Sequence, residues 1–239
     1  MEKSKKVKII IGLFYSISLF LFLFLLFSKF SLDEITSYKF IQSNRDYFYD
    51  LKNSNLLIIS LIFFAFTVFF IFMLGFGSPV ALLAGFIFGK WLGTVIVVLG
   101  LSVGAFFLYM FTNFFLKDFI KEKFLYKFKS FENKFKKNEF LFFLFFRFVG
   151  GIPLPIANIL PVLFNVSIKN YFIGTFLGIT PSIFIMVSLG SGVEKIIKKN
   201  ETAPSIIELL LSSEIYIPII FFIFLILTTL IVKKFFFKD

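Results

Sequence analysis

The chain of 239 residues contains no cysteine and no histidine. Without thiolates or imidazoles it lacks the ligands on which zinc, iron–sulfur and haem sites depend, and no disulfide can form. Acidic residues are few, 14 against 25 lysines and arginines, and none lies inside a long apolar stretch. We therefore expect no metal and no other cofactor. Paired carboxylates, Ser/Lys dyads and phosphate-binding loops are also missing, so we do not expect an enzyme.

Apolar sequence is abundant instead. Hydrophobic residues make up 59% of the chain, 43 residues are phenylalanine, and the mean hydropathy is +0.95. Because a bilayer-spanning helix needs about 20 apolar residues, we predict an all-α polytopic membrane protein. The net charge of +11 is then interpreted as lysine distributed by membrane orientation, and not as a nucleic-acid-binding surface. The uncharged stretches are 9–28, 53–89, 91–116, 140–146, 148–168, 170–193 and 215–232.

Glycine and proline break two regions of this apolar sequence. Residues 53–89 are too long for one span and too short for two. Ser78 and Pro79 are a good N-cap and N1 pair, so we expect a new short helix to start there. Non-helical backbone at membrane depth survives only where protein or water surrounds it. We therefore expect two opposed re-entrant helical hairpins, near 56–89 and 140–166. The breaking residues of the second hairpin are Gly150, Gly151, Pro153, Pro155 and Pro161.

The charge distribution favours four full crossings, at 9–28, 91–116, 170–193 and 215–232. In this layout the cytoplasmic parts carry 16 basic and 6 acidic residues and the outside parts carry 8 of each, as the positive-inside rule requires. Letting every stretch cross would give six spans but would place the lysine-rich segment 117–139 outside. We therefore expect a multi-pass protein of the cell membrane with both termini in the cytoplasm.

Three parts follow from this layout. Residues 1–55 form an N-terminal anchor helix and a polar loop, 56–193 form the membrane domain with both hairpins, and 194–239 form a loop and a C-terminal transmembrane helix.

Within the membrane domain, phenylalanines in 117–139 recur every three to five residues among lysines. That pattern predicts a basic amphipathic helix on the membrane surface, with packing on the protein itself as the alternative.

Arg147 is the only charged residue in 140–168. A charge at helix-centre depth costs at least about 2.5 kcal/mol on insertion scales, so it usually has a partner and a role. The guanidinium either caps carbonyls of its own hairpin or extends to an interface, or it binds a phosphate, whose geometry it matches. The helix starts at Ser78–Pro79 and Pro155 would add positive potential. The candidate residues for a lipid phosphate are Arg147, Ser78, Pro79, Pro153, Pro155 and Asn158.

Small residues also recur at intervals of about four, a spacing that lets membrane helices pack closely. The candidate packing residues are Gly85, Gly89, Gly93, Gly174, Gly178 and Pro181.

The segment GSPVALLAGFIFGKWLG at 77–93, with Arg147, Pro153, Pro155 and Asn158 and the downstream Gly174, Gly178 and Pro181, resembles the DedA or VTT-domain membrane proteins, also called SNARE-associated Golgi proteins. The resemblance covers roughly residues 60–193. It implies two facing hairpins related by an inverted repeat, and transport or scrambling of phospholipids or polyprenyl phosphates. Ser78 stands where DedA members proper carry an acidic residue, so the chain is more similar to the branch, bacterial relatives included, that lacks it.

We therefore expect a transporter or scramblase that moves an anionic lipid, a phospholipid or a polyprenyl phosphate, across the bilayer. A non-transporting membrane-organisation factor that acts through its basic helix is an alternative of a different class. A proton-coupled ion or solute transporter is a third, although the chain has no embedded acid or histidine to carry the proton. The expected partners are membrane lipids and not nucleic acid, and homo-oligomerisation is left open.

Overall fold

The structure is a computed structural model, and it describes residues 2–29, 55–124, 138–149, 152–199, 207 and 211–236. Every regular element in these ranges is a helix, so the all-α class is confirmed for this part of the chain. Of the surface helix expected at 117–139, the first eight residues form a helix (α7) and residues 125–137 lie outside the described residues. The elements are α1 (Glu2–Lys29), α4 (Leu56–Phe72), α5 (Gly77–Phe88), α6 (Lys90–Phe115), α7 (Lys117–Phe124), α9 (Glu139–Val149), α10 (Leu154–Ile159), η2 (Leu160–Phe164), α11 (Ile168–Lys199) and α13 (Ser213–Phe236).

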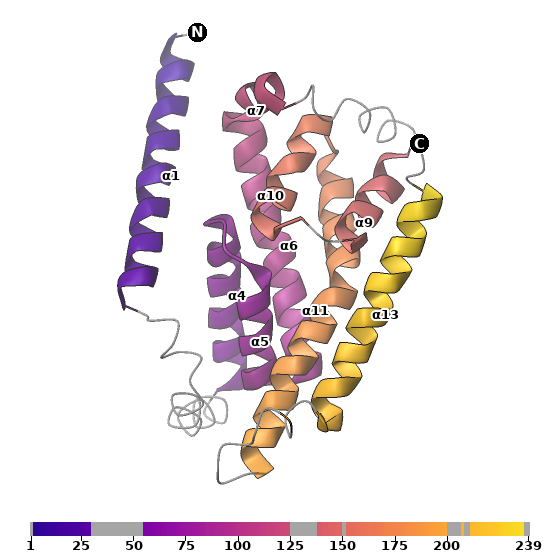
Figure 1. Cartoon of the computed structure of the whole chain (residues 1–239). Helices are drawn as coiled ribbons and strands as arrows, with labels where there is room; N and C mark the ends of the chain where they lie inside the picture. The colour runs from indigo at the N-terminus through magenta and orange to yellow at the C-terminus, as the bar shows by residue number, and fades with distance from the viewer. Residues whose placement is uncertain are drawn as a thin grey trace.

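Helices α4 and α5 form one hairpin, and α9 forms a second with α10 and η2. The two hairpins extend from opposite ends of the bundle, and both turns lie near half the height of α6 (Figure 1). The turns are neighbours, because a Cβ atom on Gly77 would lie 3.2 Å from Cδ2 of Leu154. Helix breaks therefore occur at 73–76 and 152–153, near the middle of the bundle, while the predicted breaking residues Gly150 and Gly151 lie outside the described residues.

The centre of the bundle is the pair α6 and α11. These helices run antiparallel, since Ala105 contacts Tyr171 while Gly93 lies beside Val187. Helix α11 also packs against α5, α9 and α13, and α6 packs against α4, α5 and α10. By length and composition α6, and α11 as far as Lys195, are able to cross a membrane. The crossings by α1 and α13 stay predictions.

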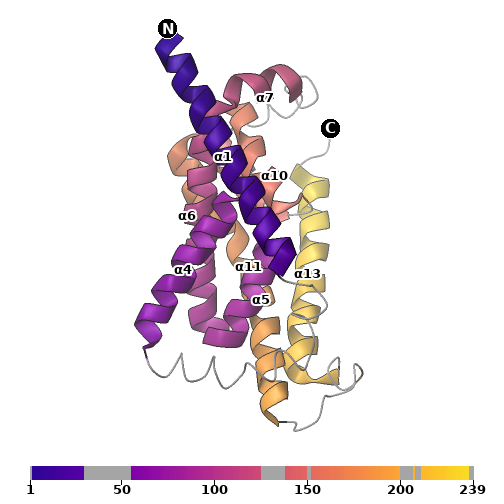
Figure 2. The same cartoon turned by 90° about the vertical axis from the view of Figure 1, so that its left-hand side faces the viewer.

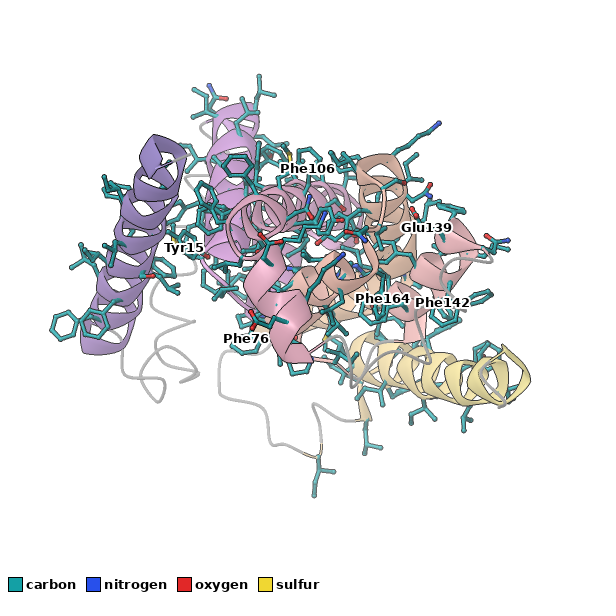
Figure 3. The ribbon with its side chains drawn as sticks, turned by 90° about the horizontal axis from the view of Figure 1, so that it is seen from above. Tyr15, Phe76, Phe106, Glu139, Phe142 and Phe164 are labelled. Atoms are coloured by element: carbon teal, nitrogen blue, oxygen red, sulfur yellow. The ribbon has the colours of Figure 1, made fainter. Side chains whose placement is uncertain are left out.

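Helix α1 lies against α4 on one side of the bundle, and the two cross at an angle (Figure 2). The Tyr15 hydroxyl donates a hydrogen bond of 2.7 Å to the carbonyl of Phe72, and the Tyr15 ring contacts Phe72 and Phe111. Figure 3 shows Tyr15 on the side of α1 that faces the bundle. The beginning of α1, α7 and the end of α13 lie at one end of the molecule (Figure 1), which we call the α7 end.

The start of α5 differs from the prediction. Its N-cap residue is Phe76, whose side chain makes no capping hydrogen bond, and Gly77, Ser78 and Pro79 form the first turn. Ser78 is thus not the cap. Proline is tolerated in the first turn because the amide lost there has no partner within the helix. Gly77 in this first turn is buried against Leu154, where a side chain would have little room.

Several glycines lie where helix backbones touch. A Cβ on Gly85 of α5 would collide with the Val187 carbonyl of α11, and one on Gly190 of α11 would collide with the Leu82 carbonyl of α5. Gly93 of α6 lies equally close to α5, because a Cβ on Gly93 would lie 2.8 Å from the Ala84 carbonyl oxygen. At Gly85 and Gly190 the backbones of α5 and α11 therefore lie too close together for any side chain to fit between them.

Gly89 does not pack against another helix, and that prediction is wrong. A Cβ there would meet nothing within 4 Å, but the residue has φ +76° at the junction of α5 and α6. Glycine is favoured at this position because an L side chain rarely adopts such a backbone conformation.

We predict that Gly85→Ala and Gly190→Ala each destabilise the protein by about 1–3 kcal/mol, the cost of forcing atoms into a packed contact. Gly12→Ala is the matched control, since a Cβ at Gly12 would meet nothing within 4 Å. The measurement is thermal unfolding of the detergent-solubilised protein, followed by loss of the monodisperse peak in size-exclusion chromatography. Equal midpoints for the Gly85 and Gly12 variants would contradict the close crossing.

Candidate functional site

Arg147 lies in the last turn of α9 and is 5% exposed. Its Nη1 donates a hydrogen bond of 2.8 Å to Oδ1 of Asn158 in α10, and its Nη2 donates one of 2.8 Å to the hydroxyl of Tyr171 in α11. The guanidinium therefore joins both arms of the second hairpin to the central helix. Neither partner is a carboxylate, so these hydrogen bonds do not neutralise its charge.

Tyr171 extends this network to α6. Its hydroxyl accepts the hydrogen bond from Arg147 and has the carbonyl oxygens of Ala105 and Asn158 as acceptors, each at 3.1 Å. The Tyr171 ring stacks on Tyr109 of α6, with ring centroids 4.1 Å apart. It also stacks on Phe143 of α9 at 5.2 Å. One buried tyrosine thus holds α6, α9, α10 and α11 together.

Aromatic faces supply part of the negative potential that the guanidinium requires. Its central carbon lies 5.2 Å from the ring centroid of Phe143 and 5.1 Å from that of Tyr171. Cation–π contacts of this kind contribute about 2 kcal/mol or more when they are desolvated. Together with two neutral oxygen acceptors, these ring faces stabilise the positive charge, but none of these groups carries a negative charge that would neutralise it.

Two glycines of α11 create the space for Arg147. A Cβ on Gly178 would lie 2.5 Å from Cβ of Arg147, and one on Gly174 would lie 2.7 Å from Cδ1 of Phe143. The predicted spacing of Gly174 and Gly178 therefore forms the surface on which α9 rests. Pro181 lies further along α11, where it lines a groove beside α13.

Four buried polar atoms near this network have no hydrogen-bond partner among the described residues: Nε of Arg147, Nδ2 of Asn158, Oγ of Ser102 and Oγ1 of Thr175. All four groups can donate a hydrogen bond. Ser102 lies one turn from Ala105 on α6 and Thr175 one turn from Tyr171 on α11, so the antiparallel pair brings both hydroxyls to one level. The site therefore combines an uncompensated cation with unused donors, an arrangement suited to an anion.

The α7 end of the second hairpin is held by Glu139. Its carboxylate accepts hydrogen bonds from the Ser167 amide at 2.8 Å and from Nδ2 of Asn170 at 2.7 Å. Partial burial raises the pKa of this carboxyl, but the hydrogen bonds from Ser167 and Asn170 outweigh it and leave the pKa below its ordinary value. Figure 3 shows Glu139 beside α11 in the view from above. The carboxylate joins the start of α9 to the start of α11.

The structure brings Arg147 and Asn158 together, but it separates them from the other predicted residues. Pro153 is the N-cap of α10 and is exposed, and Pro155 follows in the first turn. Ser78 and Pro79 belong to the first hairpin and are also exposed. They lie at the neighbouring turn, next to Gly77, and not around the buried guanidinium.

Sequence reasoning missed the residues that complete the network, above all Tyr171, Tyr109 and Phe143. Tyrosine near the end of an apolar stretch is typical of a membrane interface, and phenylalanine is too common in this chain to stand out. One signal was present. A tyrosine in the predicted span 170–193 needs a partner for its hydroxyl when it is buried, and Arg147 needed an acceptor.

A model of the VTT domain matches residues 75–192, a region that contains Arg147, Asn158, Tyr171 and both hairpin turns. The chain belongs to the DedA/VTT-domain family. It is therefore a membrane protein, in agreement with its two membrane-crossing candidates. The family match does not test the expected branch or the domain boundaries, which stay predictions.

The curated relatives of this VTT-domain protein include two named transmembrane protein 41 homolog. The protein from Caenorhabditis elegans is 26% identical over 136 residues, 54% of this chain and 55% of the relative. The protein from Dictyostelium discoideum is 28% identical over 138 residues, 55% of this chain and 41% of the relative. The match thus spans about half the length of these relatives. No solved structure matches the chain.

We predict that Tyr171→Phe destabilises the VTT-domain protein by about 1–3 kcal/mol, because the substitution leaves a buried guanidinium donor without its acceptor. Tyr15→Phe is the control, since that hydroxyl makes one hydrogen bond at the edge of the bundle. Thermal unfolding in detergent measures both. If Tyr171→Phe unfolds at the same temperature as Tyr15→Phe, the hydroxyl does not hold the guanidinium.

Proposed function

We propose that this protein carries the phosphate of an anionic lipid past the middle of the bilayer, as a transporter or scramblase of phospholipids or polyprenyl phosphates. One observation supports the proposal most strongly. Arg147 is buried at the level of both hairpin turns, with neutral hydrogen-bond partners and unused donors around it. A charge at such depth is costly, and a phosphate both offsets the cost and fits the guanidinium bidentately.

The hairpins support the proposal if they are re-entrant. In that arrangement α1, α6, α11 and α13 cross the membrane, and the turns lie near its midplane. Ser78, exposed at the first of these turns, then offers a polar contact to a headgroup that moves between the lipid and Arg147. The acyl chains remain outside, along the apolar sides of the bundle, where side chains such as Leu57 and Phe107 are exposed.

The layout also gives the proposed orientation. The α7 end carries the lysines of α7, the beginning of α1 and the end of α13 (Figure 1), so it faces the cytoplasm according to the positive-inside rule. In the cell membrane, α7 then lies at the inner surface. The α4–α5 hairpin enters from outside and the second hairpin from the cytoplasm.

Binding at Arg147 requires a rearrangement. The guanidinium is buried and bonded to Asn158 and Tyr171, so the site must open before a phosphate bonds its unused Nε or replaces one of these acceptors. Because Tyr171 also contacts the carbonyl of Ala105 on α6, the replacement loosens the second hairpin from the central helices. The arriving anion itself stabilises the opened state, since it binds that state and not the closed one.

The test is scrambling of a fluorescent anionic lipid in liposomes that contain the purified protein. We predict that Arg147→Gln lowers the rate at least about tenfold, the effect of about 1.4 kcal/mol of lost stabilisation. We predict that Arg147→Lys retains part of the rate, because it keeps the charge but not the bidentate geometry. Lys117→Gln, which removes a charge from α7, should leave the rate unchanged.

A second pair of variants guards against misfolding of the Arg147 variants. Thr175→Val removes a hydroxyl that has no partner in the structure, so it should slow scrambling without lowering stability. Its control is Thr67→Val, at an equally buried threonine whose hydroxyl bonds its own helix at Phe63. Wild-type rates in both Arg147→Gln and Thr175→Val would overturn the proposal. No scrambling by the folded wild-type protein would also overturn it and would favour the non-transporting membrane-organisation alternative.

A further inference from the structure

A second site lies away from Arg147, in a groove between α11 and α13 with a volume of about 620 Å³. Its walls are largely apolar, with Phe184 and Ile185 from α11 and Phe221 and Phe224 from α13. Figure 1 shows these two helices side by side along the edge of the bundle. An apolar groove on this edge of a membrane protein is open to acyl chains.

One end of the groove is charged. Lys90 and Lys195 both line it, and both side chains are exposed. Lys90 begins α6, at the end of the bundle opposite to α7. Trp91 follows it, exposed, with its ring 5.3 Å from that of Phe184. Tryptophan beside lysine is typical of the membrane–water interface, so the charged end lies at headgroup level.

The length of the groove fits one leaflet. Pro181 lines its inner part, and Lys195 follows it 14 positions later in the same helix, a distance of about 21 Å along the axis. Half of the hydrocarbon core is about 15 Å thick, and the headgroup region adds the rest. At the inner end the groove includes Phe148, the residue after Arg147. The groove thus extends from the interface to the middle of the bundle.

We propose that this groove binds one anionic phospholipid from the leaflet opposite to α7. An acyl chain lies between α11 and α13, and the phosphate lies between the ammonium groups of Lys90 and Lys195. An anionic headgroup is favoured over a neutral one, because two lysines and no described acidic side chain line the groove. This site goes beyond the proposed function, since it is distinct from Arg147 and does not require that lipid be transported.

Trp91 is the only tryptophan in the chain, and its contact with Phe184 makes it a reporter for the groove. The experiment reconstitutes the full chain in phosphatidylcholine bilayers that contain brominated lipid, either phosphatidylglycerol or phosphatidylcholine. The preference for the anionic lipid is measured by comparing how strongly brominated phosphatidylglycerol and brominated phosphatidylcholine quench Trp91 at equal mole fractions. We expect a preference in the wild type of about fivefold for each contributing lysine.

Variants separate the groove from general surface attraction. Lys195→Gln should lower the preference about fivefold, and the Lys90→Gln/Lys195→Gln pair should remove it, whereas Lys90→Arg/Lys195→Arg should retain it. Lys117→Gln/Lys121→Gln, at the other end of the bundle, should have no effect. Ser188→Leu fills the groove without changing its charge, and it should also remove the preference. Arg147→Gln should preserve it whether or not scrambling is lost.

Four results would overturn the groove site. They are no preference in the wild type, equal loss in the Lys117/Lys121 pair, an unchanged preference in Ser188→Leu, and competition by soluble glycerol phosphate. The last two would mean that the headgroup alone is attracted and that no chain lies between the helices.

Discussion

A full positive charge inside a membrane protein must be surrounded by groups of negative potential, and the arrangement around Arg147 follows from that constraint. No carboxylate of the described residues bonds the guanidinium, and the charge is held by the amide oxygen of Asn158, the hydroxyl of Tyr171 and two aromatic faces. These groups come from α9, α10 and α11, and Tyr171 adds a carbonyl of α6. Arg147 and Tyr171 together therefore connect four helices.

The same arrangement leaves the site incomplete in electrostatic terms. Neutral acceptors stabilise a guanidinium less than a carboxylate does, and the neighbouring donors of Ser102 and Thr175 have no acceptors. The neutral acceptors hold the guanidinium in the closed site, and its positive charge still attracts an anion. The hairpin turns place the guanidinium near the middle of the molecule, and the glycines of α11 allow α9 to pack closely against α11.

Much of this fold could be predicted because membrane insertion gives strong local signals. Glycine and proline within uncharged sequence predicted both helix breaks, and the isolated charge of Arg147 marked the site. The start of α5 was placed too late, because Ser78 and Pro79 match a local capping pattern, whereas Phe76 precedes the helix without a side-chain cap and Gly77 packs against Leu154 from a distant segment. Gly89 looked like a packing residue because spacing does not reveal backbone φ. Tyr171 was missed for a similar reason: its partner is 24 residues away in sequence, and no local pattern connects them.

The most direct measurement is a solid-state NMR experiment on the arginine itself. Arg45 and Arg147 are the only arginines in the chain, so the Arg45→Lys protein grown with ¹⁵N-arginine carries one labelled guanidinium. In bilayers of anionic phospholipid, the account predicts dipolar coupling between that ¹⁵N and lipid ³¹P, and loss of the coupling in phosphate-free glycolipid. A guanidinium that shows no coupling to phosphorus in any anionic bilayer would contradict the account.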